Sequence, residues 1–437
     1  MRRPAILSRP APATTTSPAA AVPAEPAAST RARDGVIDVI RGVCIVLMTS
    51  SHLAVGTVVD RALHPAPWVD GASGFVLMSG LVLGMVQPGR FRRGGLRGAS
   101  VQLVRRALML YAIHVALVLL SVVAGLLRPS VAWFPDVEDH GGIARTVGAT
   151  LLLRVNPPDI DILSLYVILL LLAVPALVLL AKGRAWLLGV ASVALYVGAT
   201  AAPALFTLPM GDGRSSKFNW GTWQLLFLAA FVVGWSWKRY DLRHRLAGRT
   251  AFLVAAGTWF GVTLLGVLLA SAGLVPALQP ALHQAYYDKT DQGLGRLVLA
   301  GAAFVTLYAA LTWLSTRYRL RALRPVERLG RRSLSAFVVL TLITVLVPLV
   351  AGREVHGPGA VVVMLGALLV MYGYVLLRPD TAAPARVAEQ PLAPERITTE
   401  TQEPAGQHRV GSDEAAPGTV EKTVTRETVV QERVEVP

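Results

Sequence analysis

Arg41 and His52 are two ionisable side chains within one apolar segment near the start of the chain, "DVIRGVCIVLMTSSH" at residues 38–52. On an α-helix, eleven residues advance about 16 Å and complete about three turns, so this spacing puts both side chains on one face. Asp38 lies three residues before Arg41 and can pair with it. Ionisable groups inside membrane segments are costly, which makes them candidates for a functional role.

The two side chains point to a specific chemistry. Histidine exchanges a proton near neutral pH and can take one from a hydroxyl group, and arginine keeps its charge and binds phosphate well. We therefore expect a phosphate-bearing donor to enter at Arg41 and proton transfer to occur at His52. The structural alternative is that Arg41 anchors the helix at the membrane surface while His52 is a hydrogen-bonded packing residue.

Two aspartates stand in the stretch "NPPDIDILSLY" at residues 156–166. Pro157 and Pro158 end any preceding helix and hold an extended entry to the next one. Asp159 and Asp161 then fall near a helix N-terminus, where negative charge is favoured. They are either helix caps, or one of them orients His52 or binds sugar hydroxyls.

Aromatic and amide side chains gather in the stretch "SSKFNWGTWQLLF" at residues 215–227. Trp220 and Trp223 suit the aromatic belt of a membrane interface. The alternative is a sugar site, in which an indole stacks on a sugar ring while Asn219 and Gln224 bond its hydroxyls.

The composition indicates a membrane protein. Of 437 residues, 53% are hydrophobic, and the mean hydropathy is +0.52. The net charge of +15 marks cytoplasmic loops and not a nucleic-acid partner. The single cysteine, Cys44, excludes an intrachain disulfide, and we expect no metal site. No glycine-rich phosphate loop, zinc-ligand spacing or Gly-x-Ser-x-Gly motif occurs in the sequence.

The hydropathy pattern predicts an all-α integral membrane protein, a polytopic bundle of about ten transmembrane helices. Residues 1–34 are expected to form a disordered cytoplasmic leader, 35–379 the membrane domain, and 380–437 a disordered cytoplasmic tail. Alternate loops carry 18 and 8 Lys and Arg residues, which places both termini in the cytoplasm. The expected spans are 36–58, 71–87, 101–127, 161–181, 185–202, 222–237, 251–272, 294–314, 334–351 and 359–377.

The sequence also resembles the OpgC family of membrane acyltransferases, within the acyltransferase-three superfamily. The Arg41–His52 spacing is one shared feature, and five further stretches follow in the expected order. These are "DGASGFVLMSG" at 70–80, "NPPDIDILSLYVILLLL" at 156–172, "FNWGTWQLLF" at 218–227, "YYDKTDQGLGRLVLAGAAF" at 286–304 and "LGRRSLSAFV" at 329–338. The blocks at 156–172 and 218–227 are the most specific.

The resemblance implies transfer of a succinyl or acetyl-like group, from a coenzyme A thioester on the cytoplasmic side, to hydroxyls of an extracytoplasmic glycan. His52 then corresponds to the catalytic histidine and Arg41 to a contact for the donor. Asp70 is a further binding residue. Lys289 could hold the carboxylate of a dicarboxylic acyl group or an acidic acceptor, although a solvated loop lysine is the alternative.

The chain departs from the family pattern at two positions, since Ser51 and Ser73 stand where acids are common. No permanently bound cofactor is expected. The protein would reside in the cytoplasmic membrane, with the lipid bilayer, the donor and the glycan as its partners. A transporter or flippase for a glycan or lipid precursor remains the alternative function, but no pairing of broken helices typical of transporters is visible.

Overall fold

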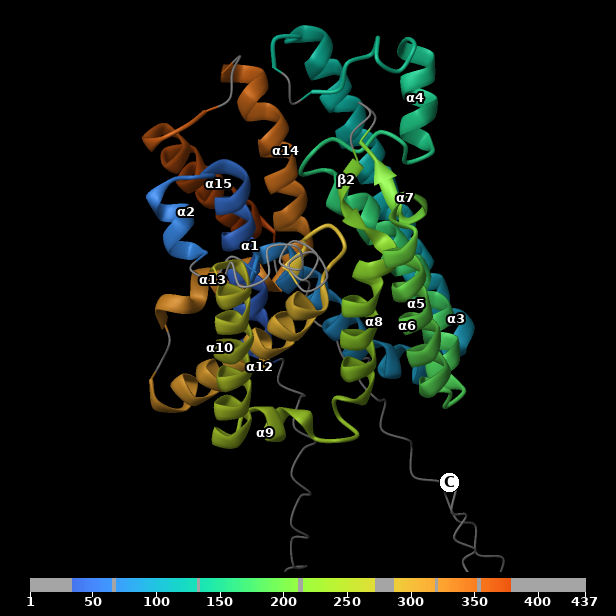
Figure 1. Ribbon diagram of the computed structural model, residues 1–437. Helices are drawn as coiled ribbons and strands as arrows, with labels where there is room; N and C mark the ends of the chain where they lie inside the picture. Colours follow the sequence, from blue (N-terminus) through green and yellow to red (C-terminus); the bar gives the residue numbers. More distant parts are fainter. Residues whose placement is uncertain are drawn as a thin grey trace, which may run out of the picture. The chain divides into compact units, whose positions relative to one another are not determined.

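The computed structural model describes residues 34–64, 68–131, 134–210, 215–271, 287–318, 321–351 and 355–378 (Figure 1). The tail predicted for residues 380–437 and nearly all of the predicted leader lie outside the described residues. The helices are α1 (Gly35–Leu53), α2 (Val58–Leu63), α3 (Gly71–Leu127), α4 (Ile143–Leu151), α5 (Asp161–Ala181), α6 (Ala185–Ala201), α7 (Pro203–Phe206), α8 (Trp220–Ser236), α9 (Leu242–Leu246), α10 (Arg249–Ser271), α12 (Leu294–Arg317), α13 (Arg324–Arg331), α14 (Ser333–Ala351) and α15 (Pro358–Leu377).

Among the described residues, strands are limited to β1 (Thr207–Pro209) and β2 (Ser215–Asn219), which pair antiparallel. The predicted all-α, polytopic fold is confirmed. Seven of the described helices are long and apolar enough to cross a membrane: α1, α3, α5, α10, α12, α14 and α15.

Each of the ten predicted ranges overlaps a described helix, but the boundaries differ: α1 ends at Leu53, so residues 54–57 of the predicted range 36–58 are not helical. Helix α3 has 57 residues and covers two of the predicted ranges, 71–87 and 101–127. Its backbone departs from helical geometry at Gly95, where φ is 59°. Helices α6 and α8 have 17 residues each.

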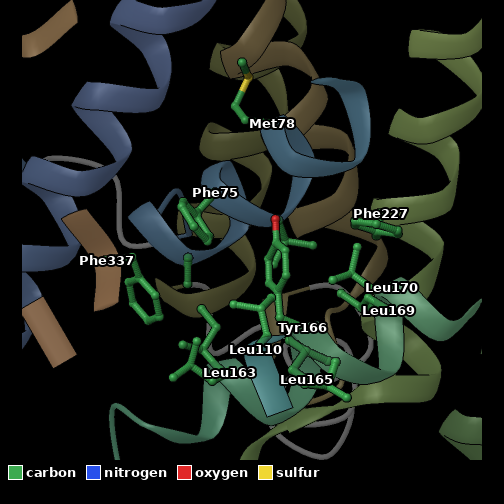
Figure 2. Packing of buried hydrophobic residues seen from close by; sticks show 14 of the residues in the cluster. Phe75, Met78, Leu110, Leu163, Leu165, Tyr166, Leu169, Leu170, Phe227 and Phe337 are labelled. Atoms are coloured by element: carbon green, nitrogen blue, oxygen red, sulfur yellow. The ribbon is translucent and has the colours of Figure 1, made fainter. Parts of the chain in front are cut away.

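The core of the bundle forms where α3 packs against α5 and α8. Tyr166 of α5 is 2% exposed, and its ring contacts Phe75 and Phe227 at centroid distances of 5.5 and 6.3 Å. Figure 2 shows these rings among the leucines of α5 and α3. Since lipid is as apolar as these side chains, close packing rather than burial from water holds the helices together.

Glycines bring two pairs of helices into backbone contact. A side chain at Gly330 of α13 would collide with the Asp38 carbonyl of α1, and one at Gly42 of α1 would collide with the Val326 carbonyl. In the same way, Gly84 of α3 fits against the carbonyl of Phe231 in α8. Small residues of this kind allow close helix crossings in membranes. Gly42 and Gly330 thereby hold α1, the helix that carries Arg41 and His52, against α13.

Gly330→Ala tests this crossing. The added methyl group should force α13 away from α1 and lower the stability by about 1–3 kcal/mol, the usual cost of overpacking. Thermal unfolding of the purified protein in lipid nanodiscs measures the change. Gly366→Ala in α15 is the control, because no described atom lies within 4 Å of its added methyl group. Equal midpoints for the two variants would contradict a tight α1–α13 contact.

Candidate functional site

His52 and Asp159 are in direct contact, with Nδ1 of the imidazole against Oδ1 of the carboxylate. The two side chains are 18% and 8% exposed. His52 lies in the last turn of α1, and Asp159 lies just before α5. The structure therefore joins two residues that are 107 positions apart in the sequence. Of the two aspartates singled out above, Asp159 is the one that contacts His52.

The backbone conformation around Asp159 orients its carboxylate towards His52. Asp159 has a φ of 67°, in the left-handed region that few non-glycine residues adopt. Asn156 ties the start of this loop to β1, donating hydrogen bonds from Nδ2 to the carbonyls of Leu153 and Pro209 at 2.7 and 2.8 Å. Strained residues of this kind persist where their surroundings hold them, and they cluster at functional sites.

The pairing determines what His52 can do. A carboxylate on Nδ1 holds the imidazole in one orientation and keeps the proton of the neutral ring on that nitrogen. The lone pair of Nε2 is then the proton acceptor. The second oxygen of Asp159, Oδ2, is buried and has no hydrogen-bond partner among the described residues.

Arg41 lies at the other end of α1, in the same continuous helix as His52. Its guanidinium donates a hydrogen bond to Ser333 at 2.7 Å and lies 3.5 Å from the Asp38 carboxylate. Its side chain is 12% exposed. Arg331 of α13 approaches the same aspartate at 4.0 Å. The guanidinium of Arg41 thus contacts α1 through Asp38 and α14 through Ser333.

Asp70 is the centre of a cluster of charges at the start of α3. Its Oδ2 lies 2.7 Å from Arg296 and 3.2 Å from Lys289, and its Oδ1 accepts a hydrogen bond from the Ser73 amide at 2.8 Å. Burial raises the pKa of Asp70, but the two cations and the Ser73 amide outweigh it, so the pKa lies well below its usual range. The structure therefore places Lys289 against a carboxylate of the protein itself.

The predicted sugar-binding residues of α8 have internal partners. Asn219 caps the helix through the amides of Gly221 and Thr222, and its Nδ2 bonds the Asp291 carboxylate at 2.9 Å. Gln224 is 0% exposed and bonds both the hydroxyl and the carbonyl of Ser192.

The indole of Trp223 is also buried inside the bundle. It is 0% exposed and donates a hydrogen bond to the Thr290 carbonyl at 3.1 Å. Its ring makes an edge contact with Phe218. In this structure Trp223 is therefore neither part of a lipid-facing belt nor an open platform for a sugar ring. Asp161, for its part, is buried in the first turn of α5.

The sequence did not reveal three residues that form hydrogen bonds or ion pairs with the predicted site residues. Arg296 could have been found as a charge inside an apolar span, seven residues after Lys289. Asp291 is one of two acids in its loop, and nothing in the sequence connects it to Asn219. Ser333, which binds Arg41, is an ordinary serine in its local sequence.

The family assignment rests on a match over most of the chain. The model of the OpgC protein family matches residues 33–380. The chain belongs to the OpgC family. The chain matches no curated protein and no solved structure. Membership of the OpgC family, together with the seven apolar helices, supports the general role of a membrane acyltransferase.

Among the described residues there is no group of three or more His, Cys, Asp or Glu side chains that could hold a metal ion.

Asp70→Asn tests whether this cluster holds the start of α3. Asparagine keeps the helix cap but leaves Arg296 buried without its counter-charge, so the stability at pH 7 should fall by about 3 kcal/mol. Because the folded-state pKa is lowered, the contribution is fully present above the unfolded-state pKa of about 3.9. It is lost only as the pH falls through the lower folded-state value.

The measurement is thermal unfolding of both proteins from pH 7 downward. Asp241→Asn is the control, since that carboxylate is 64% exposed and should leave the midpoint unchanged. An unchanged midpoint for Asp70→Asn at pH 7 would show that the cluster adds no stability.

Proposed function

We propose that this OpgC-family protein transfers an acyl group from a coenzyme A thioester to a hydroxyl of an extracytoplasmic glycan. The observation that carries the proposal is the His52–Asp159 pair, because an oriented imidazole beside a carboxylate is what removal of a hydroxyl proton requires. The family match supports the acyltransferase part of the proposal. The glycan and the thioester follow from the family resemblance of the sequence.

The reaction is a single displacement at the thioester carbonyl. Nε2 of His52 takes the proton of the sugar hydroxyl while the oxygen attacks the carbonyl carbon. The new C–O bond forms, the C–S bond breaks, and the imidazolium returns its proton to the thiolate that leaves. Asp159 stabilises the positive imidazolium between these two steps and prevents the ring from turning.

The donor would lie along α1. Arg41 would contact its phosphate-bearing end, and the acyl arm would extend towards His52, about 16 Å away along the helix axis. The bias of 18 against 8 basic residues supports a cytoplasmic Arg41 end, with both termini on the same side. This orientation in the cytoplasmic membrane puts His52 on the side where the glycan would be. The acyl group would be succinyl or acetyl-like.

His52→Ala should lower turnover by about 10²–10⁴-fold, the usual contribution of a general base, while donor binding persists. The measurement is transfer of a labelled acyl group by purified protein in lipid, with donor affinity determined separately. Arg41→Ala should show the opposite pattern, with weakened donor binding. Arg41→Lys should restore part of it, because lysine keeps the charge and loses the planar fork.

Wild-type turnover in His52→Ala would assign the histidine to packing. Envelope glycans that carry identical acyl groups with and without the protein would contradict the proposed activity as a whole. Mass spectrometry of these glycans makes the comparison.

Asp159→Asn should lower turnover by about 10²–10⁴-fold, the upper value being the loss seen when an amide replaces the carboxylate of a serine-protease triad. The amide can donate to Nδ1 and so place the imidazole proton on the wrong nitrogen. Donor affinity should not change, since Arg41 is at the far end of α1. Asp139→Asn is the control, an exposed acid between α3 and α5. Equal turnover in both variants would remove Asp159 from the mechanism.

A further inference from the structure

Gln292 is a fully buried side chain whose amide has nothing to bind. It is 0% exposed, and neither Nε2 nor Oε1 has a hydrogen-bond partner among the described residues. Buried polar groups in folded proteins are almost always paired. Gln224 provides the comparison within this chain, since it is equally buried and both of its amide atoms are bonded.

The backbone of Gln292 is also held in an unfavourable conformation. Its φ is 45°, in the left-handed region that non-glycine residues rarely adopt. Its carbonyl accepts a hydrogen bond from the Tyr196 hydroxyl at 3.2 Å, and the next amide, that of Gly293, donates to Asp288 at 3.0 Å. The surroundings therefore hold in place a residue that is both strained and unpaired. Such residues cluster at ligand-binding sites.

Arg296 adds a third unpaired atom, about one turn further along the chain. Its Nη2 bonds the Asp70 carboxylate at 2.7 Å, but its Nε is buried and has no partner among the described residues. Asp70 already compensates the charge of the guanidinium. What remains free is therefore the amide N–H₂ group, the amide oxygen and one further N–H donor, while the surplus positive charge of the cluster belongs to Lys289, which is 44% exposed. This set matches the hydroxyl groups of a neutral sugar, because each hydroxyl both donates and accepts.

The position of this loop fits the reaction proposed above. Lys289 and Arg296 both bind Asp70, which caps the start of α3. The next residue, Gly71, packs against the backbone of α1 at Cys44 and Met48, and Met48 is about one helical turn from His52. Gln292 is thereby linked to the His52 end of α1 and not to the Arg41 end.

We infer that Gln292, together with Nε of Arg296, binds hydroxyl groups of a neutral sugar. That this sugar is the acyl acceptor rests on the proposed function; the binding itself does not.

The first test compares Gln292→Met with Gln224→Met, two nearly isosteric exchanges at equally buried positions. Gln292→Met removes an amide that stabilises nothing, so its unfolding midpoint should equal or exceed that of the wild type. Gln224→Met strips Ser192 of its partner and should lower the midpoint by several degrees. A loss at Gln292 as large as the loss at Gln224 would show that its amide is satisfied, and would overturn the inference.

The second test measures binding of four neutral glucose tetrasaccharides, differing in linkage, to the full chain in nanodiscs without any acyl donor. At least one should bind to the wild type and roughly tenfold more weakly to Gln292→Met, the effect of losing about two neutral hydrogen bonds. Equal binding to both proteins, or no binding of any tetrasaccharide to the wild type, would refute the sugar site. Tighter Gln292-dependent binding of tetragalacturonic acid would refute its preference for a neutral ligand.

His52→Ala separates this inference from the proposed function. That variant should bind the same tetrasaccharide as tightly as the wild type does. If the wild type binds the tetrasaccharide in a Gln292-dependent way but transfers no acyl group to it, the proposed function is rejected and the sugar site is kept. If Gln292→Met transfers acyl groups as fast as the wild type at limiting acceptor, the proposed function is kept and the sugar site is rejected as the acceptor site.

Discussion

The position of α1 is the constraint on which the rest of the structure depends. Its backbone touches that of α13 at Gly42 and Gly330, so a shift of one residue would drive side chains into carbonyl groups. This contact fixes Arg41 beside Ser333 at one end of the helix. At the other end it fixes His52, and Asp159 then has to reach it from a strained loop. One rigid helix sets the separation between a cation and a base.

The segment before α12, residues 287–293, connects several helices of the bundle. Its residues bond α3 through Asp70, α8 through Asn219 and Trp223, and α6 through Tyr196. Three helices therefore meet at one short segment, which leads directly into α12. Because residues 288–293 belong to neither a helix nor a strand, some of their carbonyls and side chains are available for these contacts. A loop used in this way positions the helix ends as firmly as direct packing would.

The sequence predicted the features that depend on local pattern. Apolar runs indicated the helices, and the spacing of Arg41 and His52 placed both in α1. Asp159 was one of two candidates, and only the long-range contact distinguishes it from Asp161. The roles of Trp223 and Gln224 could not be predicted, since an indole or an amide looks the same in a sequence whether a ligand or the protein binds it. Arg296 was missed because its partner, Asp70, is more than 200 residues away.

The buried polar residues of this bundle fall into two groups: those whose side-chain atoms have hydrogen-bond partners within the protein, and those whose atoms do not. Asn219 and Gln224 use their amides within the protein, so replacing them should cost stability first and function only as a consequence. The side-chain amide of Gln292 and Oδ2 of Asp159 are buried and have no hydrogen-bond partner among the described residues. Burying them lowers the stability of the fold, and no hydrogen bond within the described part of the protein compensates for this loss. An unsatisfied buried group in a natural protein calls for an explanation, and a catalytic role or a bound molecule is one. At the His52 end of the bundle, the unsatisfied atoms of Gln292 and Asp159 are therefore the ones that we expect a bound substrate to complete.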